Sequence, residues 1–283
     1  MSAPADSSPS PDSSESPAEP TERAEPTASA DRAPERSADD ATDESPGDDP
    51  RLDPEYVRTL ASPDRGDLTL VGVVHDHPAS VFRAGAVVRE RAPETVALEL
   101  PPLAVPLYRE YARSDRPTPS FGGEMSAAAR AARESGADVV GVDAPTRDFL
   151  ARLARNCWRE GASLDTLRRV AGGVASVSRH AAVCRVAAAV ADRTGLRVEV
   201  DDPVAHDCSR ADPPREQARD ERRQAERSRS LLRTFDQPEP VALRDETREE
   251  SMAARLDSLR ERGDAVAIVG LDHLDGLATL SKK

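Results

Sequence analysis

The sequence predicts an α/β fold with a mostly parallel central sheet and flanking helices. Three observations support this class. Short apolar runs of strand length recur along the chain, longer stretches with helical spacing separate them, and glycine or proline marks most of the junctions. Strands that alternate with helices form βαβ units, so we expect most of the strands to run parallel.

The strongest elements follow directly from the residue pattern. Buried strands are expected over 68–74 (LTLVGVV), 96–100 (VALEL), 138–142 (DVVGV) and the start of 265–273 (AVAIVGLDH). Helices are expected over 79–91, 124–135, 148–160, 163–193 and 245–262. Gly172 and Gly173 mark either a break in the long helix or a close contact with another helix.

Other segments carry different patterns. Asp53 and Pro54 predict a short helix that runs to Leu60, and the alternating run 196–200 (LRVEV) predicts a further, half-buried strand. The prolines within 103–121 favour an irregular flap over the strand ends. Arg, Glu and Asp dominate a charged helical arm over about 209–235, and we expect a solvated helix at 210–230.

Residues 1–50 differ in composition from the rest of the chain. They hold eight Asp, six Glu and three Arg and no aromatic residue, so a disordered acidic tail is expected, either as a solvated extension or as an interaction segment. Residues 51–283 hold 36 basic and 38 acidic side chains and should form one domain. This near balance creates no field that attracts nucleic acid. The only lysines are Lys282 and Lys283, a composition that suggests a GC-rich, salt-loving, haloarchaeal-like source.

Cysteine spacing and hydropathy bear on the cellular compartment. Cys157, Cys184 and Cys208 have no CxxC spacing, which argues against a disulfide framework or a thiolate zinc site and favours a reducing compartment. The sequence shows neither a signal-peptide pattern nor an uncharged apolar run of about 18 residues. We therefore expect a soluble cytoplasmic protein.

Two histidines occur in the same strand-end context. The runs LTLVGVVH and AVAIVGLDH both finish on Gly-x-x-His, which places His75 and His273 beyond the carboxyl ends of two strands, and Glu99 and Asp143 lie at the ends of two more. Imidazoles and carboxylates are a ligand set for zinc, manganese or iron, and they also act as acid and base on water. A pair of structural, hydrogen-bonded histidines is the alternative that this pattern leaves open.

Other polar side chains fit the same edge of the sheet. Glu124 begins a helix, where the helix dipole favours a carboxylate whether or not it acts on a ligand. Arg248 lies on the apolar stripe of the last expected helix, so it either pairs with an anionic group or extends to the helix edge. His77 is close enough to His75 to be a second candidate. The remaining histidines are expected to be structural or exposed: His180 and His206.

Taken in order, these motifs resemble the TraB family of pheromone-shutdown proteins, which is related to the Tiki peptidases and to erythromycin esterase and the ChaN-like proteins. The resemblance covers about 68–280. LTLVGVVH and AVAIVGLDHLDGL resemble the two Gly-x-x-His segments of the family, and VALEL resembles its strand ending in glutamate. GGEMSAAARAARESGADVVGVD is similar to its Gly-x-Glu helix and following strand, and TREESMAARL to its arginine-bearing helix. This resemblance implies a fold like that of Tiki and erythromycin esterase.

The resemblance also implies a set of functional residues: His75, Glu99, Glu124, Arg248 and His273, with Gly72, Gly270 and Gly276 shaping the turns. It implies a divalent-metal-dependent hydrolase of a peptide or of another amide or ester. His75, His273 and Glu99 would hold zinc, manganese or iron, Glu99 or Glu124 would act as base on water, and Arg248 would stabilise the oxyanion.

The chain departs from the family pattern at two charged positions. Ala144 follows Asp143 where the family has arginine, and Thr247 precedes Arg248 where the family has glutamate. A cleft that binds or sequesters a small molecule or peptide without catalysis is therefore the alternative function. The membrane domain that family members often carry is not matched, so no membrane partner is expected. A homodimer is one option for the oligomeric state.

Overall fold

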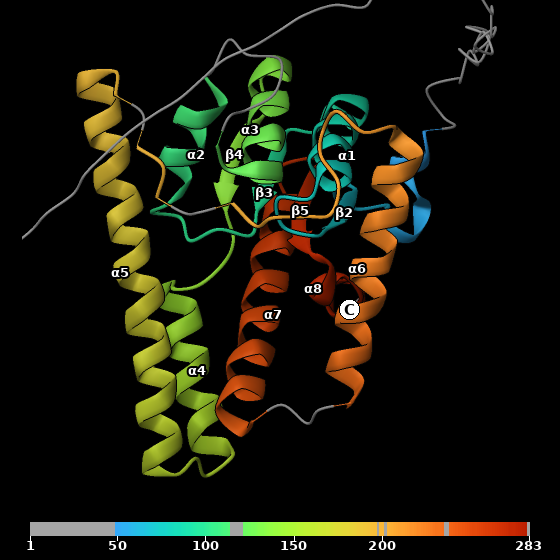
Figure 1. Cartoon of the computed structure of the whole chain (residues 1–283). Coiled ribbons are helices and arrows are strands. Elements are labelled where there is room, and N and C mark those ends of the chain that lie inside the picture. Colours follow the sequence, from blue (N-terminus) through green and yellow to red (C-terminus); the bar gives the residue numbers. More distant parts are fainter. Residues whose placement is uncertain (1–48, 114–120, 197, 201–202, 235–237, 282–283) are drawn as a thin grey trace, which may run out of the picture. The chain divides into compact units, whose positions relative to one another are not determined.

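A five-stranded sheet lies at the centre of the computed structural model, which describes residues 49–113, 121–196, 198–200, 203–234 and 238–281 (Figure 1). Of the expected tail, all but the last two residues lie outside these ranges. The strands are β1 Val57–Leu60, β2 Leu68–Val73, β3 Thr95–Leu98, β4 Asp138–Gly141 and β5 Ala265–Gly270. Their order is β1-β2-β5-β3-β4, and only β1 runs antiparallel to its neighbour. The predicted α/β class with a mostly parallel sheet is confirmed.

The helices cover both faces of this sheet. They are α1 Pro78–Arg91, α2 Val105–Ala112, α3 Gly123–Ser135, α4 Arg147–Arg159, α5 Leu164–Thr194, α6 Pro214–Thr234, α7 Glu239–Arg260 and α8 Leu271–Leu280. Alternate residues of β5 separate the two cores: Val266 and Ile268 pack with α1 and α3, whereas Ala267 and Val269 pack with α7 and α8. Such strands, buried on both faces, explain the continuous apolar runs in the sequence.

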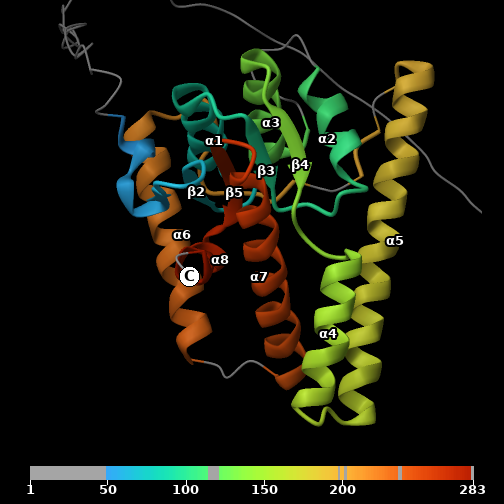
Figure 2. The same ribbon diagram turned by 180° about the vertical axis from the view of Figure 1, so that it is seen from behind.

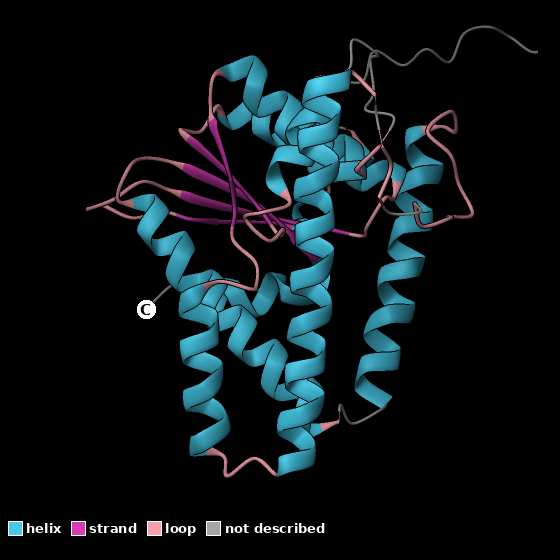
Figure 3. Cartoon of the chain, turned by 90° about the vertical axis from the view of Figure 1, so that its left-hand side faces the viewer, coloured by secondary structure: helices cyan, strands magenta, loops and turns pink. Residues whose placement is uncertain are grey.

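Four helices, α4, α5, α6 and α7, extend beyond one edge of the sheet (Figures 1 and 2). The side view shows the strands gathered at one end of these helices (Figure 3).

By length and composition alone, α5 is apolar enough to cross a membrane, but Cys184 and Ala188 on one of its faces pack against α2. Core helices of soluble proteins pass the same test, so the absence of a membrane role stays a prediction.

The short helix predicted to start at Asp53 and Pro54 is found only as one 3-10 turn, and its extension to Leu60 is wrong. Two short 3-10 turns, η2 Pro50–Leu52 and η3 Pro54–Tyr56, are followed by β1. β1 pairs with the side of β2 that β5 leaves open, so its backbone satisfies hydrogen-bonding groups that would otherwise lie at the edge of the sheet. This tertiary demand outweighs the weak local helix signal.

Two expectations around α2 are also wrong. The segment 103–121 contains this regular helix, although its stretch 114–120 lies outside the described residues. The described residues of 196–200 form no strand, and residue 197 is outside the described part. Instead of joining a ladder, the Val198 carbonyl accepts a hydrogen bond of 2.7 Å from the Tyr111 hydroxyl. An alternating pattern produces a strand only where a partner strand is available.

Gly172 and Gly173 were expected to mark either a break in the long helix or a close contact with another helix. There is no break, because α5 is continuous, and the contact is found. A Cβ atom at Gly173 would lie 3.8 Å from the Arg244 guanidinium of α7, whereas Gly172 faces open space. The long helix therefore carries its glycine pair without interruption.

The solvated charged helix expected at 210–230 is wrong for one face of α6. Gln217, Asp220 and Glu221 are at most 2% exposed and recur at helical spacing. Glu221 forms a completely buried ion pair with Arg83 of α1. Among its described side chains, the buried stripe of α6 is mainly polar, with only two alanines added, Ala218 and Ala225, so a search for apolar periodicity does not detect it.

Candidate functional site

His75 and Glu124 form a hydrogen-bonded pair at the carboxyl edge of the sheet. His75 follows β2, and its Nδ1 lies 2.8 Å from Glu124 Oε1 in the first turn of α3. Glu124 Oε2 accepts a 2.9 Å hydrogen bond from the backbone N–H of Asp76, whose φ of 57° is left-handed. Glu124 is 2% exposed and the His75 side chain 59% exposed. A buried carboxylate therefore orients an accessible imidazole.

This arrangement changes the protonation of His75. Its hydrogen bond to Glu124 raises the pKa of His75 to about 9, and the charges of Glu99 and Asp76 act in the same direction against the effect of burial. The ring is an imidazolium at neutral pH. Because Nδ1 donates to Glu124, a transferable proton remains on Nε2.

Arg248 of α7 joins two carboxylates at adjacent strand ends. It donates to both oxygens of Asp143, at 2.9 and 2.8 Å, and to Glu99 Oε1 at 2.9 Å. Burial disfavours its charge, but the hydrogen bonds to Asp143 and the charges of Glu99 and Asp245 outweigh this effect and raise the pKa of Arg248. Of the two alternatives for Arg248, the acidic partner is the one found.

His273 belongs to the first turn of α8 rather than to the end of β5, which stops at Gly270. Its Nδ1 lies 2.8 Å from Glu249 Oε1, and its Nε2 lies 3.5 Å from Glu99 Oε1. Burial lowers the pKa of His273, but Glu249 and Glu99 raise it above its usual value despite the opposing charge of Arg248. His273 thus repeats the arrangement of His75, with a carboxylate on Nδ1 and Nε2 toward the site.

Sequence reasoning missed Glu249. A signal was present, because Glu249 precedes Met252 by three residues and Leu256 by seven, which places it on the buried stripe of α7. Gly276 makes room for it: a Cβ there would lie 2.4 Å from Glu249 Oε2.

Two of the three motif glycines expected to shape turns, Gly72 and Gly276, lie inside elements and instead provide space for side chains, whereas Gly270 does lie at the junction of β5 and α8. Gly72 lies within β2, where a Cβ would press on Leu274 of α8 at 2.9 Å. A Cβ at Gly270 would lie 3.4 Å from Glu99 Oε2, 3.8 Å from His75 Nε2 and 3.9 Å from His273 Cδ2. Three of the predicted residues, His75, Glu99 and His273, therefore come together beside Gly270, the glycine of the second Gly-x-x-His segment.

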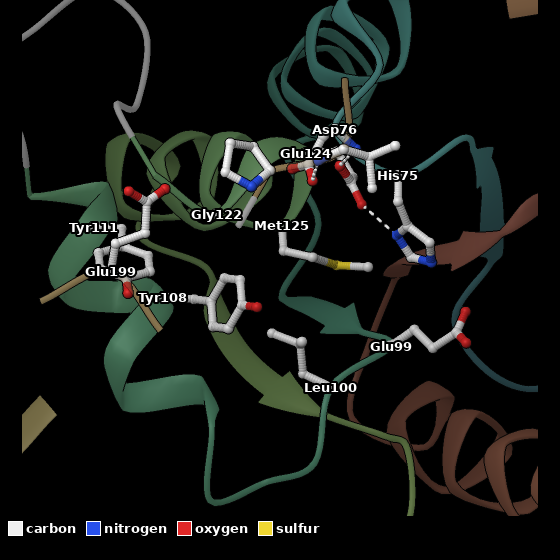
Figure 4. A pocket seen from close by; sticks show the side chains of 12 residues that line it. His75, Asp76, Glu99, Leu100, Tyr108, Tyr111, Gly122, Glu124, Met125 and Glu199 are labelled. Carbon is white, nitrogen blue, oxygen red and sulfur yellow. Dashed lines mark hydrogen bonds and ion pairs between the residues drawn. The ribbon is translucent and has the colours of Figure 1, made fainter. Parts of the chain in front are cut away.

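A cavity of about 290 Å³ opens at His75 and Glu99. These two side chains lie at one end of it, Leu100, Tyr108 and Met125 line its middle, and Tyr111 and Glu199 lie at the other end (Figure 4). The Glu99 carboxylate also accepts a 2.5 Å hydrogen bond from the Gly270 N–H. A mostly apolar chamber with acid–base groups at one end suits a small organic substrate.

The chain before α6 covers part of this cavity. Pro203 and Val204 line it, and the Val204 N–H donates to Asp76 Oδ2 at 3.0 Å. Further along, His206 Nε2 lies 2.9 Å from the His75 carbonyl oxygen and donates to it. His206 is therefore structural, as expected, and its hydrogen bond links the segment that covers the cavity to the backbone of His75.

His77 lies in a second, buried cluster. Among the described residues, only His77, Cys208 and Asp220 bring three metal-binding atoms within 4.8 Å of one another. His77 Nδ1 accepts from the Ala79 N–H at the start of α1, so the proton lies on Nε2, which faces Asp220 Oδ2 at 3.3 Å. Binding a metal at Nε2 would require that proton to leave. Hydrogen bonding accounts for this cluster, and burial lowers the pKa of His77.

The predicted metal ligands fit an ion only in part. His75 and His273 both direct Nδ1 to a carboxylate, which is the usual second shell of a metal-bound histidine. However, the third predicted ligand, Glu99, already accepts hydrogen bonds from Arg248 and from the Gly270 N–H. The ligand atoms of His75, His273 and Glu99 also do not all lie within 4.8 Å of one another, as those of the His77 cluster do. The donor set does not fit a three-ligand centre in this arrangement. The metal stays a prediction.

Comparison with known proteins adds no name to this site. No protein-family model matches the chain, and no curated protein matches it. The TraB resemblance therefore stays a prediction that rests on the order and spacing of the motifs.

Proposed function

We propose that the protein is a TraB-like hydrolase of a peptide or another small amide or ester, in which His75 acts as general acid and Glu99 as general base. One observation carries this proposal: Glu124 holds the His75 ring so that its Nε2 and the Glu99 carboxylate both lie beside Gly270. A carboxylate and an imidazolium at one end of an apolar cavity form an acid–base pair for attack by water on a carbonyl.

Proton transfer balances over one turnover. Glu99 takes a proton from the attacking water as the C–O bond forms at the carbonyl carbon. His75 then gives its Nε2 proton to the leaving nitrogen or oxygen as the scissile bond breaks. The proton on Glu99 returns to His75 Nε2 through solvent in the cavity, which restores both groups.

The surrounding residues hold this pair in place. Arg248 is a positioning residue here, since its nitrogen atoms donate to Asp143 and Glu99 and its side chain is not among the described residues that line the cavity. Arg248 and the Gly270 N–H each donate a hydrogen bond to the Glu99 carboxylate and so fix its orientation. His273, held by Glu249, lies beside Glu99, with its Nε2 3.5 Å from Glu99 Oε1.

A panel of peptide, amide and ester substrates tests this function, with each assay repeated after chelation and with added zinc, manganese or iron. We expect turnover that falls by roughly a hundredfold or more in His75→Gln and in Glu99→Gln, the usual contribution of a general acid or base. His180→Gln, an exposed histidine of α5, is the matched control and should keep full activity. Activity that survives in both site variants would exclude this mechanism, and activity only with added metal would restore the metal-dependent alternative.

A binding or sequestering protein is the second candidate. The observation that favours it is that both oxygens of Glu99 already have partners in Arg248 and Gly270. Such a protein would bind members of the same panel by calorimetry without turnover. Its binding would weaken when the cavity wall changes, as in Met125→Ala, and would persist in Glu99→Gln.

A further inference from the structure

A second cavity, of about 240 Å³, lies along α1 and α3 and shares no lining residue with the first. Four arginines line it: Arg51, Arg89, Arg130 and Arg210. The rest of its wall is apolar or uncharged and includes Val81 and Phe82, and no carboxylate is among the described residues that line it. A cavity in which arginines are the charged side chains among the described lining residues is a candidate site for an anion.

Arg51 is fixed before any ligand binds. Asp49 accepts from its Nε at 2.9 Å and from a terminal nitrogen at 2.6 Å, and the guanidinium stacks 3.5 Å from the Phe82 ring centroid. Its side chain is 16% exposed. Little rotamer entropy is therefore left to lose when Arg51 contacts an anion.

Arg89 lies along the surface of α1 because Gly85 leaves space one turn earlier. A Cβ atom at Gly85 would lie 3.2 Å from the Arg89 guanidinium. The Nε atom of Arg89 donates to Glu134 at 2.9 Å, which orients the terminal nitrogens. Gly85 therefore lines the cavity and, having no side chain, leaves room for the Arg89 guanidinium.

Arg130 contributes the deepest charge. It lies on the buried face of α3 and is only 7% exposed. Arg210 adds a fourth guanidinium from the segment before α6.

We infer that this cavity binds a phosphate monoester. A guanidinium fork matches phosphate oxygens in bidentate geometry, and several forks satisfy the three terminal oxygens of a dianion better than the two oxygens of a carboxylate. The apolar wall, with Pro78, Val81, Phe82 and Ala127, suits a short organic group attached to the phosphate. This site is separate from the proposed hydrolytic site, and its ligand is not the substrate of that site.

Calorimetric titration of the full chain tests the inference, with inorganic phosphate, a short alkyl phosphate and the matching alkyl carboxylate as probes. Ionic strength is held constant with chloride, because non-specific charge effects depend on salt. We expect the alkyl phosphate to bind more tightly than phosphate, and the carboxylate to bind most weakly. Arg89→Gln and Arg130→Gln should each weaken binding by roughly tenfold, since one charge-assisted hydrogen bond is lost.

Arg159→Gln is the control, because this arginine is exposed on α4 and paired with Glu160 just as Arg89 is paired with Glu134. Its binding should equal that of the unchanged chain. Arg89 is 51% exposed, so its variant keeps the test valid if Arg130→Gln fails to fold. No heat with any phosphate, equal loss in Arg159→Gln, or equal affinity for the carboxylate would each overturn the inference.

Discussion

His75 and His77 are two residues apart, yet the fold gives them opposite environments. The His75 side chain is 59% exposed at the mouth of a cavity, and Glu124 raises its pKa to about 9. His77 is completely buried, begins α1 as its cap, and has its pKa lowered by burial. Both nevertheless contact a buried carboxylate, since Glu124 and Asp220 are each 2% exposed.

The difference shows that a carboxylate partner alone does not charge a histidine. His75 keeps contact with water, so the hydrogen bond to Glu124 dominates. His77 has lost all contact with water, and one of its nitrogens already accepts from Ala79. Desolvation then outweighs the carboxylate, and the ring stays neutral. The first arrangement suits proton transfer and the second suits structure.

Buried charged and polar groups of the α1–α6 contact, where His77 lies, should be more sensitive to mutation than the exposed His75. Arg83→Met leaves Glu221 completely buried without its cation, which should lower the free energy of unfolding by about 3–5 kcal/mol. Urea denaturation measures this loss. The double variant Arg83→Met with Glu221→Leu should recover most of it, and failure to recover would mean that the ion pair is not what joins α6 to α1.

The two histidines should differ in the stability that each contributes. His77→Ala leaves the Ala79 N–H without its acceptor and removes one of the hydrogen bonds to Asp220, which should cost about 1–3 kcal/mol. His75→Ala should cost less, because the ring is half exposed and Glu124 keeps the Asp76 N–H as a partner. His77→Asn, which keeps a capping acceptor, should recover part of the loss. Equal losses for the two alanine variants would refute the distinction.

Removing the carboxylate should make His75 resemble an ordinary histidine. In Glu124→Gln the pKa of His75 should fall from about 9 toward 6.5, as followed by NMR titration of the ring. Glu134→Gln, an exposed change on the same helix, should leave it at about 9. An unchanged pKa in Glu124→Gln would assign the shift to other charges.

Stability should depend on pH in opposite senses through the two rings. The pKa of His75 is raised by folding, so its contribution is complete below about 6.5 and is lost as pH rises through about 9. The pKa of His77 is lowered by folding, so its contribution is lost as pH falls below 6.5. Urea midpoints across this range should show a smaller alkaline decline in His75→Gln, where the contribution of His273 remains, and a smaller acidic decline in His77→Gln.

The smallest effect is expected at Gly276. In Gly276→Ala the new methyl group displaces the flexible end of Glu249, which weakens its hydrogen bond to His273. The pKa of His273 should fall while that of His75 stays at about 9, and stability should change little. Gly136→Ser, at an open position of the α3 C-cap with a φ of 79°, costs stability through backbone strain and leaves both pKa values unchanged.

Much of the fold was predictable because its strands are short apolar runs with clear boundaries. Leu68–Val73 and Ala265–Gly270 lie where the pattern places them, and His75 and His273 follow each of them within three residues. The convergence of these histidines with Glu99 follows from a general property of parallel sheets. Glu124 was also found, since its position at a helix start is visible in the sequence.

The partners of these residues could not be predicted in the same way. Arg248 was expected to need an anion, but only the fold selects Asp143 and Glu99 for it. The errors at β1 and at 196–200 have the same origin, because strand formation depends on which partner edge is open.

Local residue pattern alone therefore decided the α/β class, the parallel core and the two Gly-x-x-His segments, because burial on a sheet imposes a short period that is visible along the chain. Tertiary structure decided which carboxylate meets which cation, and it buried the polar stripe of α6 against α1. These pairs join residues more than a hundred positions apart, such as Arg83 and Glu221. Their charges depend on solvent exposure, which no local pattern specifies.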